Sequence, residues 1–105
     1  MPQLRDRPIL SDFQEYVVQL ERERGFSHQT LLQKCLLLGE EMGELFKSIR
    51  KIEGLSMDDK SKVGAAADEL ADVFIYLCAI ANRLGIDLEK AFRDKEAINQ
   101  TRTWK

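Results

Sequence analysis

The chain has 105 residues, 44% of them hydrophobic and 32% charged, which suits one globular domain that buries roughly two-thirds of its unfolded surface. A formal net charge of −2 gives no indication of the basic field that is typical of proteins that bind nucleic acid polymers. The longest apolar run, around residues 70–81, contains Asp72 and is too short to span a bilayer, and the N-terminus has no apolar signal core. We therefore expect a cytoplasmic protein that binds neither a nucleic acid polymer nor a membrane.

The first predicted helix follows a loose polar lead-in over residues 1–9. Ser11 begins a capping-box pattern that Gln14 completes, and apolar residues at helical spacing continue the helix to Arg24. Gly25 follows as the C-terminal stop, because glycine readily adopts the left-handed conformation that ends many helices.

The second predicted helix is capped by Ser27 or Thr30, carries a broad apolar face and ends near Gly54. Within it, Gly39 and Gly43 lie one turn apart, and each costs about 1 kcal/mol of helix propensity relative to alanine. We interpret this pair as a sign that a neighbouring segment packs closely against the helix.

Residues 54–62 form the main predicted loop. The third helix is expected to begin at Ser61 or Lys62 and to end at Leu84, with Gly85 as its stop.

A fourth helix is expected after its cap, Asp87, and residues 100–105 form a polar tail. Trp104, within that tail, is interpreted as a packing anchor rather than a base-stacking group. Four helices with short connections and no strand alternation predict an all-α, four-helix bundle.

Apolar residues occur on more helix faces than a chain of this size can cover. Leu36 and Leu37 extend the apolar surface of the second helix, and the third helix is apolar around most of its circumference. This pattern predicts a homodimer or homotetramer. Cys35 and Cys78 lie within apolar helical patterns and are interpreted as reduced core residues.

Two carboxylates are prominent on the third helix. Between Leu70 and Ala81 only Asp72 ionises near neutral pH, and a helix that is apolar nearly all round is normally buried. Glu69, Asp72 and Tyr76 share one face of this helix at i, i+3, i+7 spacing. Because buried carboxylates are costly without compensation, we expect a partner for this pair.

A second pair, Glu41 and Glu44, shares a face of the second helix, with Glu40 beside it. If the two helices pack antiparallel, about 8–10 Å apart, four carboxylates converge on one small volume. Mg²⁺ or Mn²⁺ would relieve their repulsion, because these hard cations prefer carboxylate oxygen. No histidine lies near either pair, which disfavours zinc and the Glu-x-x-His di-iron sites.

The sequence EEMGE at residues 40–44, followed by ELAD at residues 69–72, resembles the E-E-x-x-E and E-x-x-D motifs of the MazG-like all-α nucleoside triphosphate pyrophosphohydrolases. The resemblance extends over residues 15–104. It includes ERERGF before the second helix and a C-terminal signature at Lys95, Asn99 and Arg102. It implies a single MazG-like domain over residues 1–105, completed by oligomerisation.

The resemblance also implies an activity: Mg²⁺-dependent hydrolysis of a nucleoside triphosphate, including deoxy or non-standard nucleotides, to a nucleoside monophosphate and pyrophosphate. Either Glu40 or Glu41 would orient or deprotonate the attacking water. The metal ligands that it implies are Glu41, Glu44, Glu69 and Asp72. The substrate-binding residues that it implies are Tyr76, Lys95, Asn99 and Arg102.

Other interpretations stay open from the sequence. Lys47 is a candidate for contacting the triphosphate, with a solvated helix face as the alternative. Phosphoribosyl-ATP pyrophosphatase shares the acidic motif, although its N-terminal segment has no match here. A non-catalytic helical oligomerisation module would use the carboxylates for structural ions or interhelical pairing, but the complete set of four argues against it.

Overall fold

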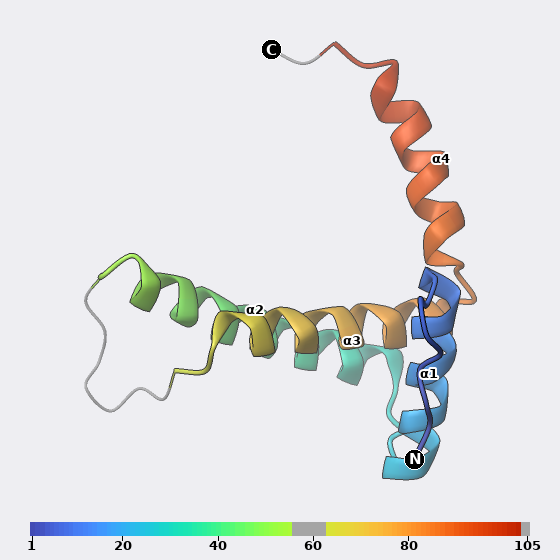
Figure 1. Cartoon of the computed structure of the whole chain (residues 1–105), viewed down its shortest axis with the longest axis horizontal. Coiled ribbons are helices and arrows are strands. Elements are labelled where there is room, and N and C mark those ends of the chain that lie inside the picture. The colour runs from blue at the N-terminus through green and yellow to red at the C-terminus, as the bar shows by residue number, and fades with distance from the viewer. Residues whose placement is uncertain (56–62, 104–105) are drawn as a thin grey trace. The chain divides into compact units, whose positions relative to one another are not determined.

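The computed structural model describes residues 1–55 and 63–103. Within them it contains four α-helices and no strand: α1 (Leu10–Arg24), α2 (Leu31–Ile52), α3 (Ala66–Leu84) and α4 (Leu88–Gln100) (Figure 1). The all-α prediction is thereby confirmed. Most of the expected loop, both predicted starts of the third helix and Trp104 lie outside the described residues. Among the helices described, none combines the length and the hydropathy needed to cross a membrane.

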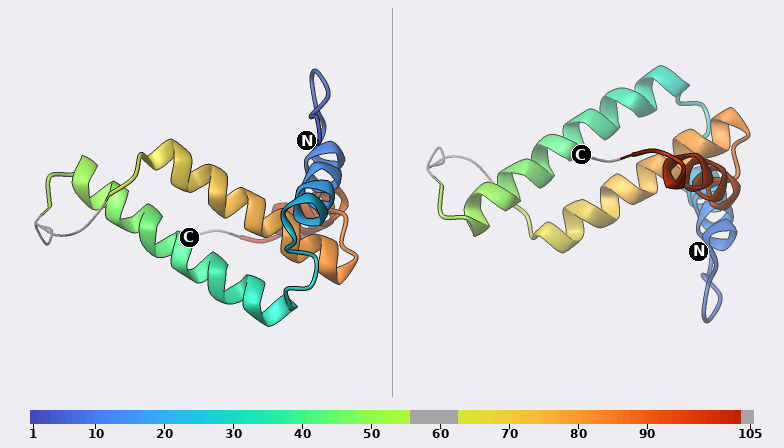
Figure 2. Two further views of the ribbon diagram at one scale, coloured as in Figure 1. Left: turned by 90° about the horizontal axis from the view of Figure 1, so that it is seen from below. Right: turned by 90° about the horizontal axis from the view of Figure 1, so that it is seen from above.

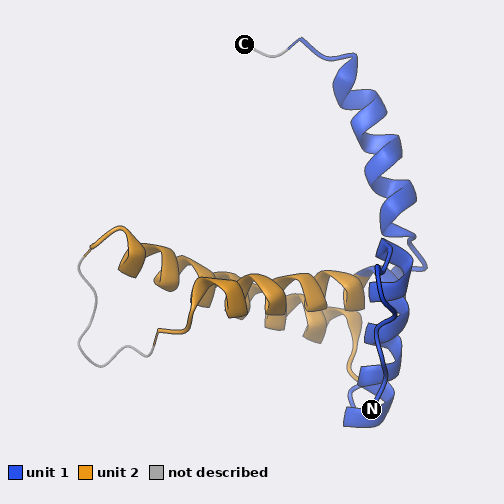
Figure 3. Cartoon of the chain, in the orientation of Figure 1, with its two compact units in different colours: residues 1–28, 81–105 blue, residues 29–80 orange. Residues whose placement is uncertain are grey.

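The chain divides into two compact units (Figure 3). Unit 1 comprises residues 1–28 and 81–105, and it includes α1, α4 and the last turn of α3. Unit 2 comprises residues 29–80, and it includes α2 and the remainder of α3.

The first helix of unit 1 begins differently from the prediction. Ile9 occupies the N-cap position, and its backbone N–H donates a 2.8 Å hydrogen bond to Oδ2 of Asp12. The predicted capping box at Ser11 and Gln14 is therefore wrong, because Asp12 satisfies the first free amide instead. The predicted stop at Gly25 is confirmed by its left-handed conformation, φ 75°.

Gln14 has a tertiary role in unit 1. Its side-chain amide donates to Oδ1 of Asn82 at 3.2 Å and to the carbonyl oxygen of Ile86 at 2.8 Å. Its Oε1 accepts the backbone N–H of Leu88 at 2.9 Å. One buried side chain thus joins α1 to the turn between α3 and α4.

A buried ion pair also holds unit 1 together. Arg83 donates two hydrogen bonds to the carboxylate of Glu21, at 2.9 and 2.8 Å, and a third to the carbonyl oxygen of Phe26 at 3.2 Å. The Arg83 and Glu21 side chains are only 17% and 7% exposed. Such a planar, two-point contact is among the stronger hydrogen-bonded pairs in proteins.

In unit 2, α2 and residues 66–80 of α3 run side by side in opposite directions (Figure 2). Thr30 is the N-cap of α2: its Oγ1 accepts the N–H of Gln33 at 3.1 Å, and Oε1 of Gln33 accepts the N–H of Thr30 at 2.8 Å. Of the two predicted caps, Thr30 is therefore correct. The third helix begins at Ala66, later than predicted, since residues 63–65 are not helical.

Unit 2 leaves much apolar surface uncovered in a single chain. Leu32 and Leu36 on α2 are 68% and 65% exposed, and Leu70 on α3 is 56% exposed. Leu36 and α3 belong to the surface from which the sequence predicts an oligomer.

The two cysteines differ in environment. Cys78 is fully buried, and burial raises the pKa of its thiol to about 11, as suits an unreactive core residue. Cys35 is exposed, so its interpretation as a core residue is wrong for the single chain. The space beside Gly39 and Gly43 is also open, and no described segment packs closely there.

Candidate active site

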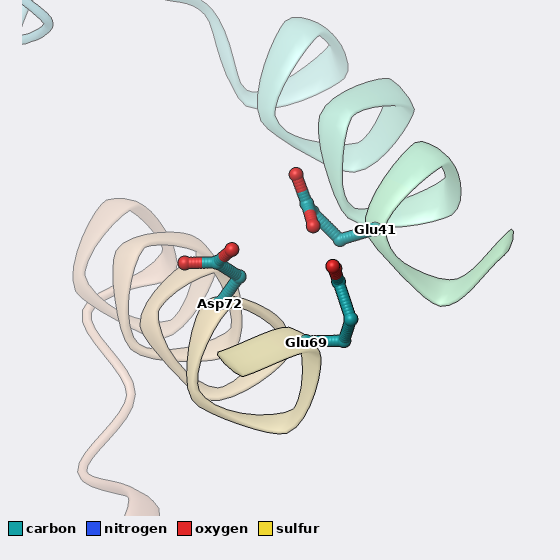
Figure 4. A group of neighbouring side chains, drawn as sticks. All are labelled: Glu41, Glu69 and Asp72. Atoms are coloured by element: carbon teal, nitrogen blue, oxygen red, sulfur yellow. The ribbon is translucent and has the colours of Figure 1, made fainter. Parts of the chain in front are cut away.

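Three of the predicted metal ligands come together in unit 2. Glu41 lies on α2, whereas Glu69 and Asp72 lie one turn apart on α3. Figure 4 shows Glu69 directed towards Glu41, with the Asp72 carboxylate on the same side of α3. Each residue offers one carboxylate oxygen, and these three oxygens lie within 4.8 Å of one another. The i, i+3 spacing aligns the pair on α3, and the antiparallel partner helix supplies the third group.

This proximity changes the acidity of Glu41. Partial burial raises the pKa of its carboxyl group above the ordinary value, and a hydrogen bond with Glu69 raises it further. The negative charges of Asp72, Glu69 and Glu44 act in the same direction. In the ion-free protein, Glu41 therefore holds its proton more tightly than an isolated glutamic acid does.

The remaining two acidic candidates are placed differently. Glu44 is not part of the group of three, although it is close enough for its charge to affect Glu41. Its carboxylate pairs with Nζ of Lys47 at 3.5 Å, so the candidate phosphate ligand Lys47 already has a partner. Glu40 is exposed on α2 and likewise lies outside the group.

Tyr76 lies one turn beyond Asp72 on α3 and is half-buried. Nζ of Lys34 lies 5.4 Å from the centroid of its ring, within range of a cation–π contact. Lys34 is 3% exposed and was not singled out by the sequence. A signal existed, because Lys34 precedes Glu41 by seven residues and so falls on the same face of α2.

The C-terminal candidates belong to unit 1. Lys95 is exposed on α4, and Asn99, near the end of that helix, donates a long 3.5 Å hydrogen bond to Oε2 of Glu96. Arg102 lies just beyond α4, and its backbone N–H bonds the carbonyl oxygen of Asn99 at 3.1 Å. Their contact with a substrate stays a prediction.

The fold and the acidic group agree with one protein family. Residues 26–102 match the model of the MazG nucleotide pyrophosphohydrolase domain, and the chain belongs to this family. The domain is thus of the nucleotide pyrophosphohydrolase class.

Individual relatives support the assignment. Two crystal structures of iMazG from Vibrio DAT 722, Ctag-iMazG and Ntag-iMazG, each have a TM-score of 0.69. They are 33% and 32% identical to this chain, cover 89% and 92% of it, and are themselves 99% covered. A dATP/dGTP diphosphohydrolase from Cyanophage S-2L is 38% identical over 65 residues, which are 62% of this chain. The chain spans about half the length of that curated relative, 50%.

Proposed function

We propose that this chain hydrolyses a nucleoside triphosphate to the monophosphate and pyrophosphate at the carboxylates of α2 and α3. One observation carries the proposal: Glu41, Glu69 and Asp72, from two antiparallel helices, offer oxygens within 4.8 Å of one another. In the described part of the chain, no lysine or arginine forms an ion pair with any of the three. Their mutual repulsion is therefore available to favour a bound cation.

The donor set suits Mg²⁺ or Mn²⁺. All three groups are carboxylates, the ligand type that these hard cations prefer, and no histidine or cysteine belongs to the group. We propose Glu44 as a fourth ligand, reached by turning away from Lys47. The ion would neutralise charge on the triphosphate and lower the pKa of the attacking water.

The chain's own residues would orient the reaction. Glu40 or Glu41 would accept a proton from the water that attacks the α-phosphorus. The bond between the α-phosphorus and its bridging oxygen would then break, and pyrophosphate would leave with the electron pair of that bond. Direct attack by water is expected, because the chain contains no Walker-type loop and no Ser, Cys or His beside the carboxylates in sequence to act as a covalent nucleophile.

Further residues would bind the nucleotide. We propose Tyr76, half-buried one turn beyond Asp72, as part of the nucleoside pocket. For the phosphates we propose the cations Lys47, Lys95 and Arg102, with Asn99 as a hydrogen-bonding group. The relative from Cyanophage S-2L, a dATP/dGTP diphosphohydrolase, makes purine deoxynucleotides the first substrates to test.

We further propose a homodimer or homotetramer in the cytoplasm, with residues 1–105 acting as one domain. The exposed leucines of α2 and α3 support the oligomer, because an interface would cover apolar side chains that a single chain leaves in water. The family match, residues 26–102, runs through both units and supports the single domain. Sedimentation at micromolar concentration measures the oligomer, and a stable 12.1 kDa monomer would contradict it.

Product analysis tests the reaction. The protein should be incubated with dATP, dGTP, the pyrimidine deoxynucleotides and the ribonucleotides, with Mg²⁺, with Mn²⁺ and with chelator. Hydrolysis in ¹⁸O-labelled water should place the label on the nucleoside monophosphate and release unlabelled pyrophosphate. Label in orthophosphate, with a nucleoside diphosphate as the co-product, would show that attack occurs at the γ-phosphorus.

A further inference from the structure

Gly64 lies just before α3. The position that a Cβ would take at this residue is next to the carboxylate of Glu69. A Cβ built on Gly64 would overlap Oε1 of Glu69 and would lie 3.4 Å from Cδ of the same side chain. All three of the nearest atoms belong to Glu69. The Glu69 carboxylate therefore occupies the space that a side chain at position 64 would need.

The backbone does not itself require glycine at this position. Only Gly25, Gly54 and Gly85 have positive φ among the described glycines, so Gly64 does not have the left-handed φ that favours glycine. Glycine is needed here for a steric reason, because Glu69, one of the three clustered carboxylates, occupies the position of a Cβ.

The Glu69 side chain folds back over the start of its own helix. Its backbone N–H donates to the carbonyl oxygen of Ala65 at 3.2 Å, in the first turn. Its carboxyl group lies beside Gly64 and is hydrogen-bonded with Glu41. Figure 4 shows this carboxylate directed at Glu41. A side chain at position 64 would displace the Glu69 carboxylate and would therefore change its distance from the carboxylates of Glu41 and Asp72.

We propose that Gly64 is a positioning residue, whose missing side chain leaves the Glu69 carboxylate room to join Glu41 and Asp72. The inference rests on the proposed cation site. A Cβ would push against the flexible end of Glu69 and not against backbone, so the fold would tolerate it. The cation site would not tolerate the displacement, because the distances between a metal ion and its ligand atoms must be correct to about 0.2 Å.

Four variants test the inference: Gly64→Ala, Glu69→Asp, the double variant, and Gly39→Ala as a control. Gly39 suits the control because nothing described lies within 4 Å of its built Cβ. Two quantities are measured for each protein: the affinity for Mn²⁺ by titration calorimetry, and the melting temperature with and without the ion.

Gly64→Ala should weaken Mn²⁺ binding roughly 10- to 100-fold, the usual loss when the support of a metal ligand is disturbed. The ion-free melting temperature should stay the same or rise, because alanine restricts the unfolded chain more than glycine does. Gly39→Ala should leave the affinity unchanged. Glu69→Asp weakens binding by itself, but it shortens the side chain and removes the overlap, so adding Gly64→Ala to it should cost less than about twofold.

The outcomes separate this inference from the proposed function. If Glu69→Asp leaves Mn²⁺ binding unchanged, the cation site itself is wrong. If Glu69→Asp weakens binding and Gly64→Ala does not, the site stands and the role of Gly64 is refuted. Two other results would also overturn the role, because each contradicts a displaced flexible side-chain end: failure of Gly64→Ala to fold, or an equal loss from Gly64→Ala whether or not Glu69→Asp is also present.

Discussion

In unit 1 the carboxylate of Glu21 receives two hydrogen bonds from Arg83, whereas in unit 2 the carboxyl group of Glu41 lies beside two further carboxylates. Both arrangements place acidic groups away from full contact with water, yet the charge of Glu21 is balanced and that of Glu41 is not. The pair also stabilises the charged form of Arg83, since the hydrogen bond with Glu21 raises the pKa of its guanidinium. Glu41 has its pKa raised by burial and by its acidic neighbours.

The difference separates a buried charge pair that serves the structure from a cluster of half-buried and exposed carboxylates, which we assign to function. A buried ion pair holds two elements together, and removal of one member leaves the other as a buried charge without compensation. A cluster of like charges opposes folding, and binding of a cation would relieve the repulsion. Substitutions at the Glu21–Arg83 pair should therefore act on stability, and substitutions of the three clustered carboxylates should act on cation binding and activity.

The largest effect is expected from neutralising the acidic group. Glu69→Gln and Asp72→Asn each remove a charge that would hold the cation, which supplies several kcal/mol of transition-state stabilisation. We expect pyrophosphate release to fall on the order of 10³-fold or more. The ion-free melting temperature should not fall, because repulsion within the group is relieved. A variant that lost stability and kept its activity would reverse the assignment of roles.

The next effect is expected from breaking the pair in unit 1. Arg83→Met leaves the Glu21 carboxylate, 7% exposed, without its bidentate partner. Removing one member of a buried pair costs about 3–5 kcal/mol of folding stability. Urea denaturation measures the loss. Arg93→Met is the matched control, since Arg93 pairs with Glu89 on the surface with a side chain 74% exposed, and such pairs contribute about 0–1 kcal/mol. Equal losses from both variants would contradict the contrast.

The smallest effect is expected in the pH dependence of stability. Because the pKa of Glu41 is raised in the folded protein above its ordinary value of 4.5, the folded state binds a proton more tightly than the unfolded state. The resulting stability is fully present below the unfolded pKa and is lost as the pH rises through the folded pKa.

Thermal melts between pH 4 and pH 8 test this prediction. The ion-free protein should lose melting temperature with rising pH relative to Glu41→Gln, which cannot titrate at that position. Saturating Mg²⁺ should remove the difference. A melting temperature of the ion-free protein that rises with pH relative to Glu41→Gln would show that the shift has the opposite sign.

Local features of the sequence determined most of the secondary structure. Thr30 and Asp87 cap helices as predicted, because a side-chain oxygen one residue before a helix needs only its own next turn as a partner. Gly25 and Gly85 end helices for an equally local reason, a left-handed backbone. Glu69 and Asp72 share a face because three residues make nearly one turn.

Tertiary structure decided which of these side chains meet. Ser11 and Gln14 fit a capping box as well as a local pattern can, but Gln14 bonds residues 68 to 74 positions away, which no local pattern contains. The group of three includes Glu41 and not its neighbour Glu44, because the rotation and register of α2 against α3 determine which carboxylate faces across. The overlap between a Cβ at position 64 and Glu69 also depends on the conformation of the Glu69 side chain. Spacing along a helix follows from backbone geometry alone, whereas convergence between helices depends on how whole surfaces pack.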